Sequence, residues 1–284
     1  MKIGVPKEIK NHEYRVGLTP ASVREFVAHG HSVMVQAGAG AAIGLDDAQY
    51  RAAGATLADS AQEVFAQADM IVKVKEPQPA ECAMLRPGQL LYTYLHLAPD
   101  PEQTAALVKS GAVCVAYETI TGANGGLPLL APMSEVAGRM SIQAGAAHLE
   151  KSKGGMGVLL GGVPGVAPGH VAILGAGVVG THALQCAVGA GARVTVLDKN
   201  VDRLRQLDLV FGNRITTLYS NAQSVEEWLV CTRHGWPAVW VPTSPSWSDR
   251  TSACATSTTA SRGLCAASCP TPTASSNSWR PMTP

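Results

Sequence analysis

Charged residues are scarce in this chain of 284 residues. They make up 15% of the sequence, and 22 basic side chains against 21 acidic ones leave a net charge of +1. A nearly neutral chain has no electrostatic attraction for nucleic acid or for an anionic membrane surface. No apolar run reaches the ~18 residues that a membrane span needs. We therefore expect no nucleic-acid partner and no membrane partner.

Metal-type cysteine pairs are also lacking. The seven cysteines form no CxxC pair, and the closest two, Cys265 and Cys269, have no histidine nearby. This spacing argues against a zinc site. Residues 1–17 have no long apolar core and predict a strand and a loop rather than a signal peptide. The expected protein is cytoplasmic and holds no metal.

Lysine and acidic residues almost disappear toward the C-terminus. Residues 228–284 contain no Lys and one acid, Asp249, whereas 26 of the 57 residues are Ser, Thr or Pro. All five tryptophans lie there as well. No apolar period of 2 or 3.6 persists, and Pro237–Pro242 is the one candidate strand. The pattern predicts a break near Glu227, followed by a tail without regular structure.

The clearest motif lies at residues 170–198. The apolar run Val171–Leu174 ends in the turn Gly175-Ala176-Gly177-Val178-Val179-Gly180, an apolar-periodic stretch follows, and a second β-rich run ends at Asp198. A strand, a GxGxxG turn, a helix, a strand and an acid in this order are typical of a dinucleotide site. A plain βαβ unit with a tight turn is the alternative reading.

Each residue of this motif has a physical role in the nucleotide-binding interpretation. Gly175 permits the tight turn, Gly177 lets the backbone approach a pyrophosphate, and Gly180 allows close packing of helix on strand. The helix N-terminus then stabilises the phosphate charge. Asp198 is expected to accept hydrogen bonds from the ribose hydroxyls and to repel a 2′-phosphate, which favours NAD over NADP.

Residues 1–130 alternate between strand and helix patterns, which predicts a parallel α/β domain. The expected helices cover 20–29, 46–53, 60–66 and 101–110. The expected strands are Lys2–Val5, Ser32–Gln36, Asp69–Lys75, Gln89–Leu95 and Ala112–Tyr117.

Three polar residues occupy corresponding places in this domain. Arg15 lies in the first strand-to-helix connection, and Lys75 and His96 each end an expected strand. Taken singly, Arg15 and Lys75 fit solvated surface charges, and His96 fits a half-buried histidine. Ligands of open parallel sheets bind beyond the carboxyl ends of the strands. The shared position therefore favours a ligand site made of all three.

The chemistry of this set suits a small acid. Arg15 can make a two-pronged contact with a carboxylate. The Lys75 ammonium can polarise a carbonyl or hydroxyl-like oxygen, and His96 can transfer a proton near neutral pH. Beside a nicotinamide, these groups predict a dehydrogenase of a small 2-amino or 2-hydroxy acid.

A long helix and a linker are expected to join the two domains. Residues 130–151 are rich in helix formers, and Ser134 near their start can donate to a cofactor phosphate or hydroxyl, or cap the helix. Residues 152–169 are a Gly/Pro-rich linker. The expected organisation is a substrate domain at 1–130, a helix and linker at 131–169, a partial nucleotide domain at 170–227 and a tail at 228–284.

Several separate motifs resemble those of the bacterial alanine dehydrogenases. They are MKIGVPKEIKNHEYRVGLTP, VKVKEP, YTYLHLAPD, and HVAILGAGVVG with VTVLDKNVDRLRQLD, and the resemblance covers roughly residues 1–227. It implies reversible conversion of L-alanine, NAD and water to pyruvate, ammonia and NADH. It also implies a homohexamer and two doubly wound, Rossmann-like parallel-sheet domains, the second incomplete after about residue 227.

The resemblance also implies roles for single residues. Arg15 corresponds to the carboxylate-binding arginine, Lys75 to the substrate lysine and His96 to the catalytic acid/base. The NAD-binding subunit of proton-translocating transhydrogenase shares the arginine motif but performs no chemistry on a small acid, and the YLHLA histidine favours the dehydrogenase. Implied NAD contacts come from Ser134, Gly175, Gly177, Val178, Val179, Gly180, Asp198, Arg203 and Ser220.

The tail departs from the family pattern. The remaining strands and a second catalytic residue, an aspartate, are not recognisable after about residue 227, and Asp249 lacks the matching surroundings. The composition suggests translation in a shifted frame from about Trp228, with a natural Ser/Thr/Pro-rich extension as the rival reading. We expect impaired or lost activity. The alternatives are a non-catalytic, truncated remnant or a transhydrogenase-like NAD-binding module.

Overall fold

The computed structural model describes residues 1–233 and 238–242, which form two compact units, Met1–Leu130 and the described residues from Ala131 onward. Most of the predicted tail, residues 234–237 and 243–284, lies outside the described residues. In the part that is described, no helix is long and apolar enough to cross a membrane.

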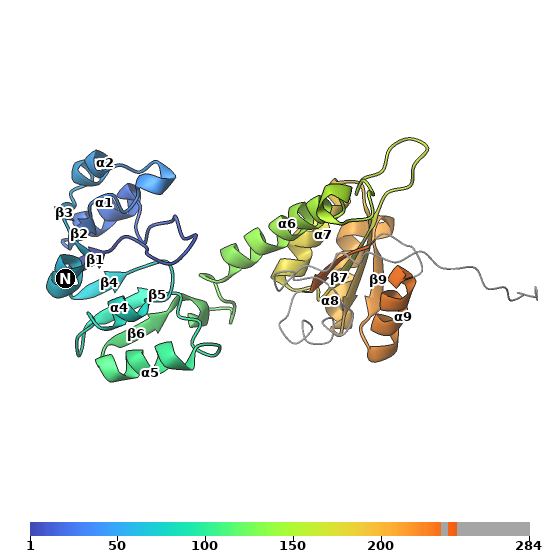
Figure 1. Ribbon diagram of the computed structural model, residues 1–284. Coiled ribbons are helices and arrows are strands. Elements are labelled where there is room, and N and C mark those ends of the chain that lie inside the picture. The colour runs from blue at the N-terminus through green and yellow to red at the C-terminus, as the bar shows by residue number, and fades with distance from the viewer. Residues whose placement is uncertain (234–237, 243–284) are drawn as a thin grey trace, which may run out of the picture. The chain divides into compact units, whose positions relative to one another are not determined.

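The first unit is built on one parallel sheet of six strands in the order β3-β2-β1-β4-β5-β6 (Figure 1). This is the strand order of a doubly wound nucleotide-binding domain, in which the order reverses between the first and fourth strands. Its strands are β1 (Lys2–Val5), β2 (Ser32–Gln36), β3 (Thr56–Ala58), β4 (Met70–Val72), β5 (Leu90–Thr93) and β6 (Val113–Ala116).

Helices cover both faces of this sheet. One buried cluster places Val23 and Tyr50 of α1 and α2 against β1 and β2, and another places Phe65 and Leu107 of α3 and α5 against β4 and β5. Helix α1 begins where the sequence predicts, because Thr19 accepts a hydrogen bond from the Ser22 amide and Pro20 follows it. The helices are α1 (Pro20–Ala28), α2 (Asp47–Ala52), α3 (Ala61–Gln67), α4 (Pro79–Cys82) and α5 (Pro101–Ser110), with the short turns η1 (Ala41–Ile43) and η2 (Tyr117–Thr119).

Two strands end earlier than the sequence predicts. The strand expected at 69–75 ends at Val72, and the strand expected at 89–95 ends at Thr93. The Glu8 carboxylate accepts hydrogen bonds from the Val74 and Lys75 amides, so a side chain replaces a neighbouring strand there. Strand β3 and helix α4 are too short for their periodicity to have been recognised.

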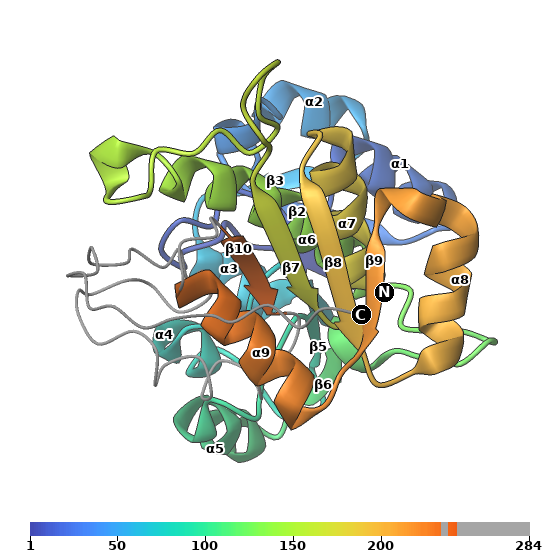
Figure 2. The same ribbon diagram turned by 90° about the vertical axis from the view of Figure 1, so that its right-hand side faces the viewer.

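The second unit holds a parallel sheet of four described strands in the order β10-β7-β8-β9 (Figure 2). Reading outward from β7, the order repeats the first half of the doubly wound pattern and adds one strand beyond the reversal. The strands are β7 (His170–Leu174), β8 (Arg193–Asp198), β9 (Thr216–Tyr219) and β10 (Ala238–Pro242).

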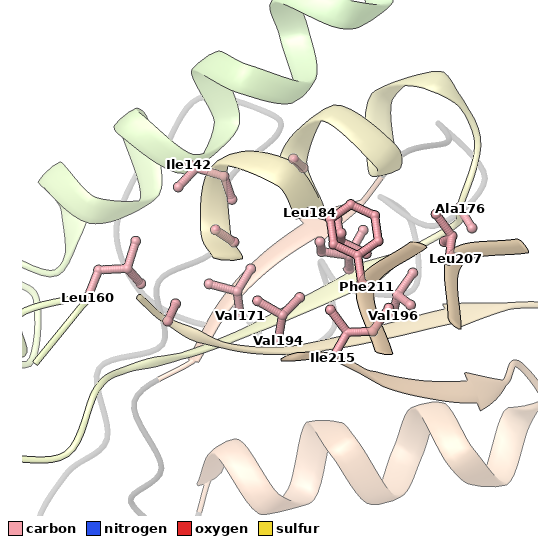
Figure 3. Close-up of a cluster of buried hydrophobic side chains, with 14 of the residues drawn as sticks. Ile142, Leu160, Val171, Ala176, Leu184, Val194, Val196, Leu207, Phe211 and Ile215 are labelled. Atoms are coloured by element: carbon pink, nitrogen blue, oxygen red, sulfur yellow. The ribbon is translucent and has the colours of Figure 1, made fainter. Parts of the chain in front are cut away.

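This second sheet is covered on both faces as well. Helices α6, α7 and α8 contribute Ile142, Leu184 and Leu207 to one buried cluster, shown in Figure 3, whereas Val225 of α9 packs on the opposite face. The helices are α6 (Ala131–His148), α7 (Val178–Gly189), α8 (Val201–Phe211) and α9 (Ala222–Arg233), with the turns η3 (Lys151–Lys153) and η4 (Gly212–Arg214).

The described structure continues past the composition break at Glu227. Helix α9 runs through to Arg233, and the Trp228 ring lies edge-on against His170, with 4.6 Å between ring centroids. Strand β10 covers most of the one candidate strand of the tail and pairs with β7 in parallel. The predicted fold class, two doubly wound parallel-sheet domains, is confirmed.

Candidate active site

The polar residues singled out in the first domain lie at one edge of its sheet. Arg15 follows β1, Lys75 follows β4 and His96 follows β5, and β1 and β4 are the neighbours between which the strand order reverses. Ligands of doubly wound sheets bind at this reversal, beyond the carboxyl ends of the strands. The charges of the three side chains also influence one another. The positive charge of Arg15 lowers the pKa of Lys75, and the positive charge of Lys75 lowers the pKa of His96.

Arg15 is oriented by Glu13. Its Nε donates to Glu13 Oε1 at 2.8 Å, its Nη2 donates to Glu13 Oε2 at 2.6 Å, and its backbone amide donates to the same carboxylate. The hydrogen bond from Arg15 lowers the pKa of Glu13, and the same bond raises the pKa of the guanidinium. Because 41% of the Arg15 side chain is exposed, the guanidinium remains accessible to an incoming anion.

Lys75 carries a half-buried ammonium. Burial lowers its pKa, and the positive charges of Lys10 and Arg15 lower it further, against opposition from Glu13 and Glu118. Its backbone is held by the Glu8 carboxylate and by the Thr93 hydroxyl, which donates to the Lys75 carbonyl at 2.9 Å. An ammonium carried on this anchored backbone is suited to donating a hydrogen bond to a substrate oxygen.

His96 presents its imidazole at the surface of the same edge. Its Nδ1 lies 3.3 Å from Glu76 Oε2, and its ring stacks on Tyr94 with 5.9 Å between centroids. An ionised carboxylate only accepts hydrogen bonds, so a neutral imidazole here carries its proton on Nδ1 and leaves Nε2 as the basic nitrogen. Partial burial and the charge of Lys75 lower the pKa of His96.

A buried ion cluster beneath these residues was not foreseen from the sequence. The fully buried Lys73 ammonium donates to Glu8 Oε2 at 3.0 Å and to Glu81 Oε1 at 2.7 Å, and both carboxylates are almost completely buried. Glu8 therefore ties the β1–α1 connection to the end of β4. In the sequence, Lys73 looks like an interruption of the apolar run 70–74, which was the available signal.

The glycine turn of the second domain joins β7 to α7. Gly175 has φ +103°, and a Cβ at Gly180 would overlap the Gly175 carbonyl oxygen, so both positions require glycine. A Cβ at Gly177, the N-cap of α7, would meet no atom of the chain within 4 Å. Open space in front of a helix N-terminus is where a phosphate group fits.

Asp198 and Arg203 hold this turn from two sides. Asp198 accepts hydrogen bonds from the Ala176 amide at 2.6 Å and the Asn200 amide at 2.7 Å. Arg203 donates from Nε to the Ala176 carbonyl and from Nη2 to the Thr181 hydroxyl. The backbone of Ala176 is thus hydrogen-bonded at both its amide and its carbonyl group. Arg203 therefore stabilises the turn, a role that the sequence did not suggest.

The other residues of the expected nucleotide site lie around the same edge. Val178 and Val179 open α7, and Ser220 follows β9, where its amide donates to the Asp198 carbonyl at 2.9 Å. Ser134 precedes Gly138 by one turn of α6, and Gly138 packs directly on the Val179 carbonyl of α7. Ser134 therefore shares the α6 face that meets the start of α7. No cluster of His, Cys, Asp or Glu within residues 1–233 and 238–242 is arranged to hold a metal ion.

Two parallel sheets with polar residues at their carboxyl edges, one with a glycine turn and a following acid, define a doubly wound protein whose second domain has the pattern typical of dinucleotide-binding domains. Comparison with protein families narrows this class. Residues 4–137 match the model described as "Alanine dehydrogenase/PNT, N-terminal domain", and residues 141–242 match its C-terminal domain. The chain belongs to the alanine dehydrogenase/PNT family.

Individual relatives agree with this assignment. The chain is 57% identical over 227 residues to an alanine dehydrogenase of Halomonas elongata, and 54% identical over 226 residues to one of Mycobacterium tuberculosis. Each match covers 80% of this chain and 61% of the relative. A solved L-alanine dehydrogenase matches at a TM-score of 0.75 with 53% identity, covering 80% of this chain and 63% of that one. The chain therefore spans about three fifths of its relatives' length. A transhydrogenase from Sinorhizobium meliloti, 22% identical with a TM-score of 0.69, shares the fold.

Proposed function

We propose that this chain is an NAD-dependent L-alanine dehydrogenase, in which the first domain binds L-alanine or pyruvate and the second binds the dinucleotide. The observation that supports this proposal most is that Arg15, Lys75 and His96 all follow strands at one edge of the first sheet, Arg15 and Lys75 beside its reversal point and His96 after the next strand, β5. Family membership and 52–57% identity to alanine dehydrogenases support the choice of reaction.

Each of the three residues has a distinct task in this proposal. Arg15 binds the substrate carboxylate, because its permanently charged guanidinium is oriented by Glu13 and can make charge-assisted hydrogen bonds to an anion. Lys75 donates to the oxygen on the reacting carbon of pyruvate, and its charge stabilises negative charge that develops there. His96, whose lowered pKa favours the neutral imidazole, accepts a proton from the water that adds to the imine during L-alanine oxidation and returns one in the reverse direction.

The residues of the glycine turn fit a dinucleotide. The open space before Gly177 and the free N-terminus of α7 suit the pyrophosphate, and Asp198 suits the ribose hydroxyls. The resemblance assigns further contacts with the dinucleotide to Ser134, Val178, Val179, Arg203 and Ser220. A nicotinamide bound there would supply the hydride acceptor for oxidation of L-alanine at its α-carbon.

We further propose that turnover is impaired or lost in this chain. The identity to alanine dehydrogenases extends over 225 to 227 residues, and Asp249, the one acid of residues 228–284, lacks the surroundings that the resemblance implies for the second catalytic aspartate. Removing one member of a cooperating catalytic set costs several orders of magnitude in rate in well-studied enzymes. A cytoplasmic homohexamer is the expected state by resemblance, which size-exclusion chromatography with light scattering would test.

One assay decides between the proposed function and its alternatives. The purified chain and its His96→Asn variant are incubated with L-alanine and NAD at alkaline pH, and NADH formation is followed. Turnover that disappears in the variant supports the dehydrogenase. Measurable NAD binding without any turnover identifies a nucleotide-binding module, and absence of both identifies a non-catalytic remnant.

A further inference from the structure

His96 has an unusual backbone conformation. Its φ is +48°, and it is one of two non-glycine residues with positive φ in residues 1–233 and 238–242. The left-handed region is unfavourable for residues with a Cβ and persists only where the surroundings hold it. A proton-transferring side chain cannot be replaced by glycine, so another group has to stabilise this conformation.

The Glu118 carboxylate lies where it can stabilise this backbone conformation. Glu118 Oε1 accepts hydrogen bonds from the Leu95 amide at 3.0 Å and from the His96 amide at 2.7 Å. Consecutive amides that turn toward one point form an anion-binding concavity. Here the anion belongs to the protein itself, and it binds the backbone of the residue whose imidazole faces the site.

Glu118 is in turn rigidly placed. It lies in η2, directly after Tyr117, whose ring packs edge-on between those of Tyr92 and Tyr94 at 4.4 and 5.0 Å. The Tyr117 hydroxyl donates to the Lys73 carbonyl at 2.9 Å, which ties η2 to the end of β4. The carboxylate is therefore fixed relative to the strand ends that carry both Lys75 and His96.

Other residues bind the backbone carbonyls next to His96. The Leu95 side chain is buried in the core, and its carbonyl accepts a hydrogen bond from Gln103 Nε2 at 2.7 Å. The Leu97 carbonyl accepts from the Thr104 hydroxyl at 3.1 Å. These bonds secure the carbonyls of the residues on either side of His96, whereas Glu118 binds the amides of Leu95 and His96.

We propose that Glu118 is a positioning residue for His96, holding its backbone in the left-handed conformation so that the imidazole faces the substrate edge. This rests on the proposed function only in taking His96 as the acid/base; the structural claim is independent of turnover. Four charged groups act on or contact the imidazole: Lys75 after β4, Lys10 in the β1–α1 connection, Glu76 at Nδ1, and Glu118 itself, whose charge opposes the lowering of the His96 pKa.

Two variants of the full chain separate geometry from charge. Glu118→Gln keeps an oxygen that can accept from both amides but removes the negative charge. Glu118→Ala removes both. Glu102→Gln, at an exposed position in α5, is the matched control. The measurements are amide hydrogen exchange at Leu95 and His96 and NMR titration of the His96 ring, neither of which requires activity.

The expected results differ between the variants. In Glu118→Ala the two amides should exchange on the order of 10- to 100-fold faster, as expected for loss of a hydrogen bond to a charged group. In Glu118→Gln the amides should stay protected while the His96 pKa falls, and Glu102→Gln should match the wild type.

Unchanged exchange in the alanine variant, or an unchanged His96 titration in the glutamine variant, overturns the proposal. If the alanine variant does not fold, the titration of the glutamine variant decides. Absence of NADH formation would count against the proposed function alone.

Discussion

At the scale of single residues, the candidate site depends on carboxylates as much as on cations. Glu13 orients Arg15, Glu8 binds the amides at the end of β4, and Glu118 binds those around His96. Acidic partners fix the direction of cationic side chains that would otherwise repel one another and sample many rotamers. The sequence identified the cations by their place after strands, but acids that act on distant backbone leave no local pattern.

Replacing Arg15 tests its carboxylate-binding role. Arg15→Lys keeps the charge but loses the forked geometry, so pyruvate affinity should fall about 10- to 100-fold, the range for a lost charge-assisted hydrogen bond. Calorimetric titration with pyruvate in the presence of NADH measures the effect. Arg24→Lys, exposed on α1, serves as the control. Equal affinity in Arg15→Lys and the wild type would remove Arg15 from the proposed site.

Replacing Lys73 tests the buried ion cluster. Lys73→Met leaves the Glu8 and Glu81 carboxylates buried without their shared counter-ion, which should destabilise the first domain by about 3–5 kcal/mol. Hydrogen exchange of the β5 amides reports the free energy of opening in this domain. The exposed Lys109→Met should change it little. A loss below about 1 kcal/mol in Lys73→Met, the range of exposed ion pairs, would contradict the buried-cluster account.

At the scale of elements, the two domains fix their ligand edges in different ways. In the second domain, α7 packs so closely on the turn after β7 that a side chain at Gly180 would overlap the Gly175 carbonyl oxygen, and α6 packs on α7 so closely that a side chain at Gly138 would overlap the Val179 carbonyl oxygen. In the first domain, hydrogen-bonded carboxylates connect the strand ends. Backbone packing of this kind is encoded by glycines at fixed spacing, which explains why the second site was easier to recognise from the sequence.

Two glycines of the turn should therefore respond differently to alanine. Gly180→Ala forces α7 away from β7, so both the stability of the second domain and NAD affinity should fall. Gly177→Ala has room for its Cβ and an ordinary φ of −67°, so stability should be kept while NAD affinity falls. Thermal unfolding and calorimetric NAD titration separate these outcomes. Gly189→Ala is the control, because a Cβ at this position near the end of α7 would meet no other atom within 4 Å. A stable Gly180→Ala protein with normal NAD binding would refute the packing argument.

At the scale of the whole molecule, two sheets with separate cores make up the described chain. In the second sheet, strand β7 begins at His170, which contacts Thr195 of β8 and Trp228 of α9. One titratable residue thus lies where several elements of the second domain meet. Its protonation state should influence that domain more than the first.

The second domain should lose stability in mild acid. Burial, with a smaller effect of the Arg193 charge, lowers the pKa of His170 from 6.5 to about 4. The unfolded chain then binds more protons between these values, so stability falls as the pH drops from about 6.5 to about 4. Hydrogen exchange of the β8 amides across this range should show the loss. The loss of stability with falling pH should be smaller in His170→Gln, whereas a substitution at an exposed position, His148→Gln, should leave it as in the wild type. Equal pH dependence in all three proteins would show that His170 does not control the stability of this domain in acid.

By itself, the sequence determined the alternation of strands and helices, the parallel fold class, the glycine turn with Asp198, and Arg15, Lys75 and His96 as candidates. These follow from periodicity, from glycine spacing and from the rule that ligands bind after parallel strands, all of which are local in the chain. Only the tertiary structure decided that β4 and β5 end early, that Lys73 lies between two buried acids, that Arg203 braces Ala176, and that Glu118 binds the backbone of His96. Each of these depends on groups from separate segments meeting in space, and hydrogen bonds of that kind have no period or spacing along the chain.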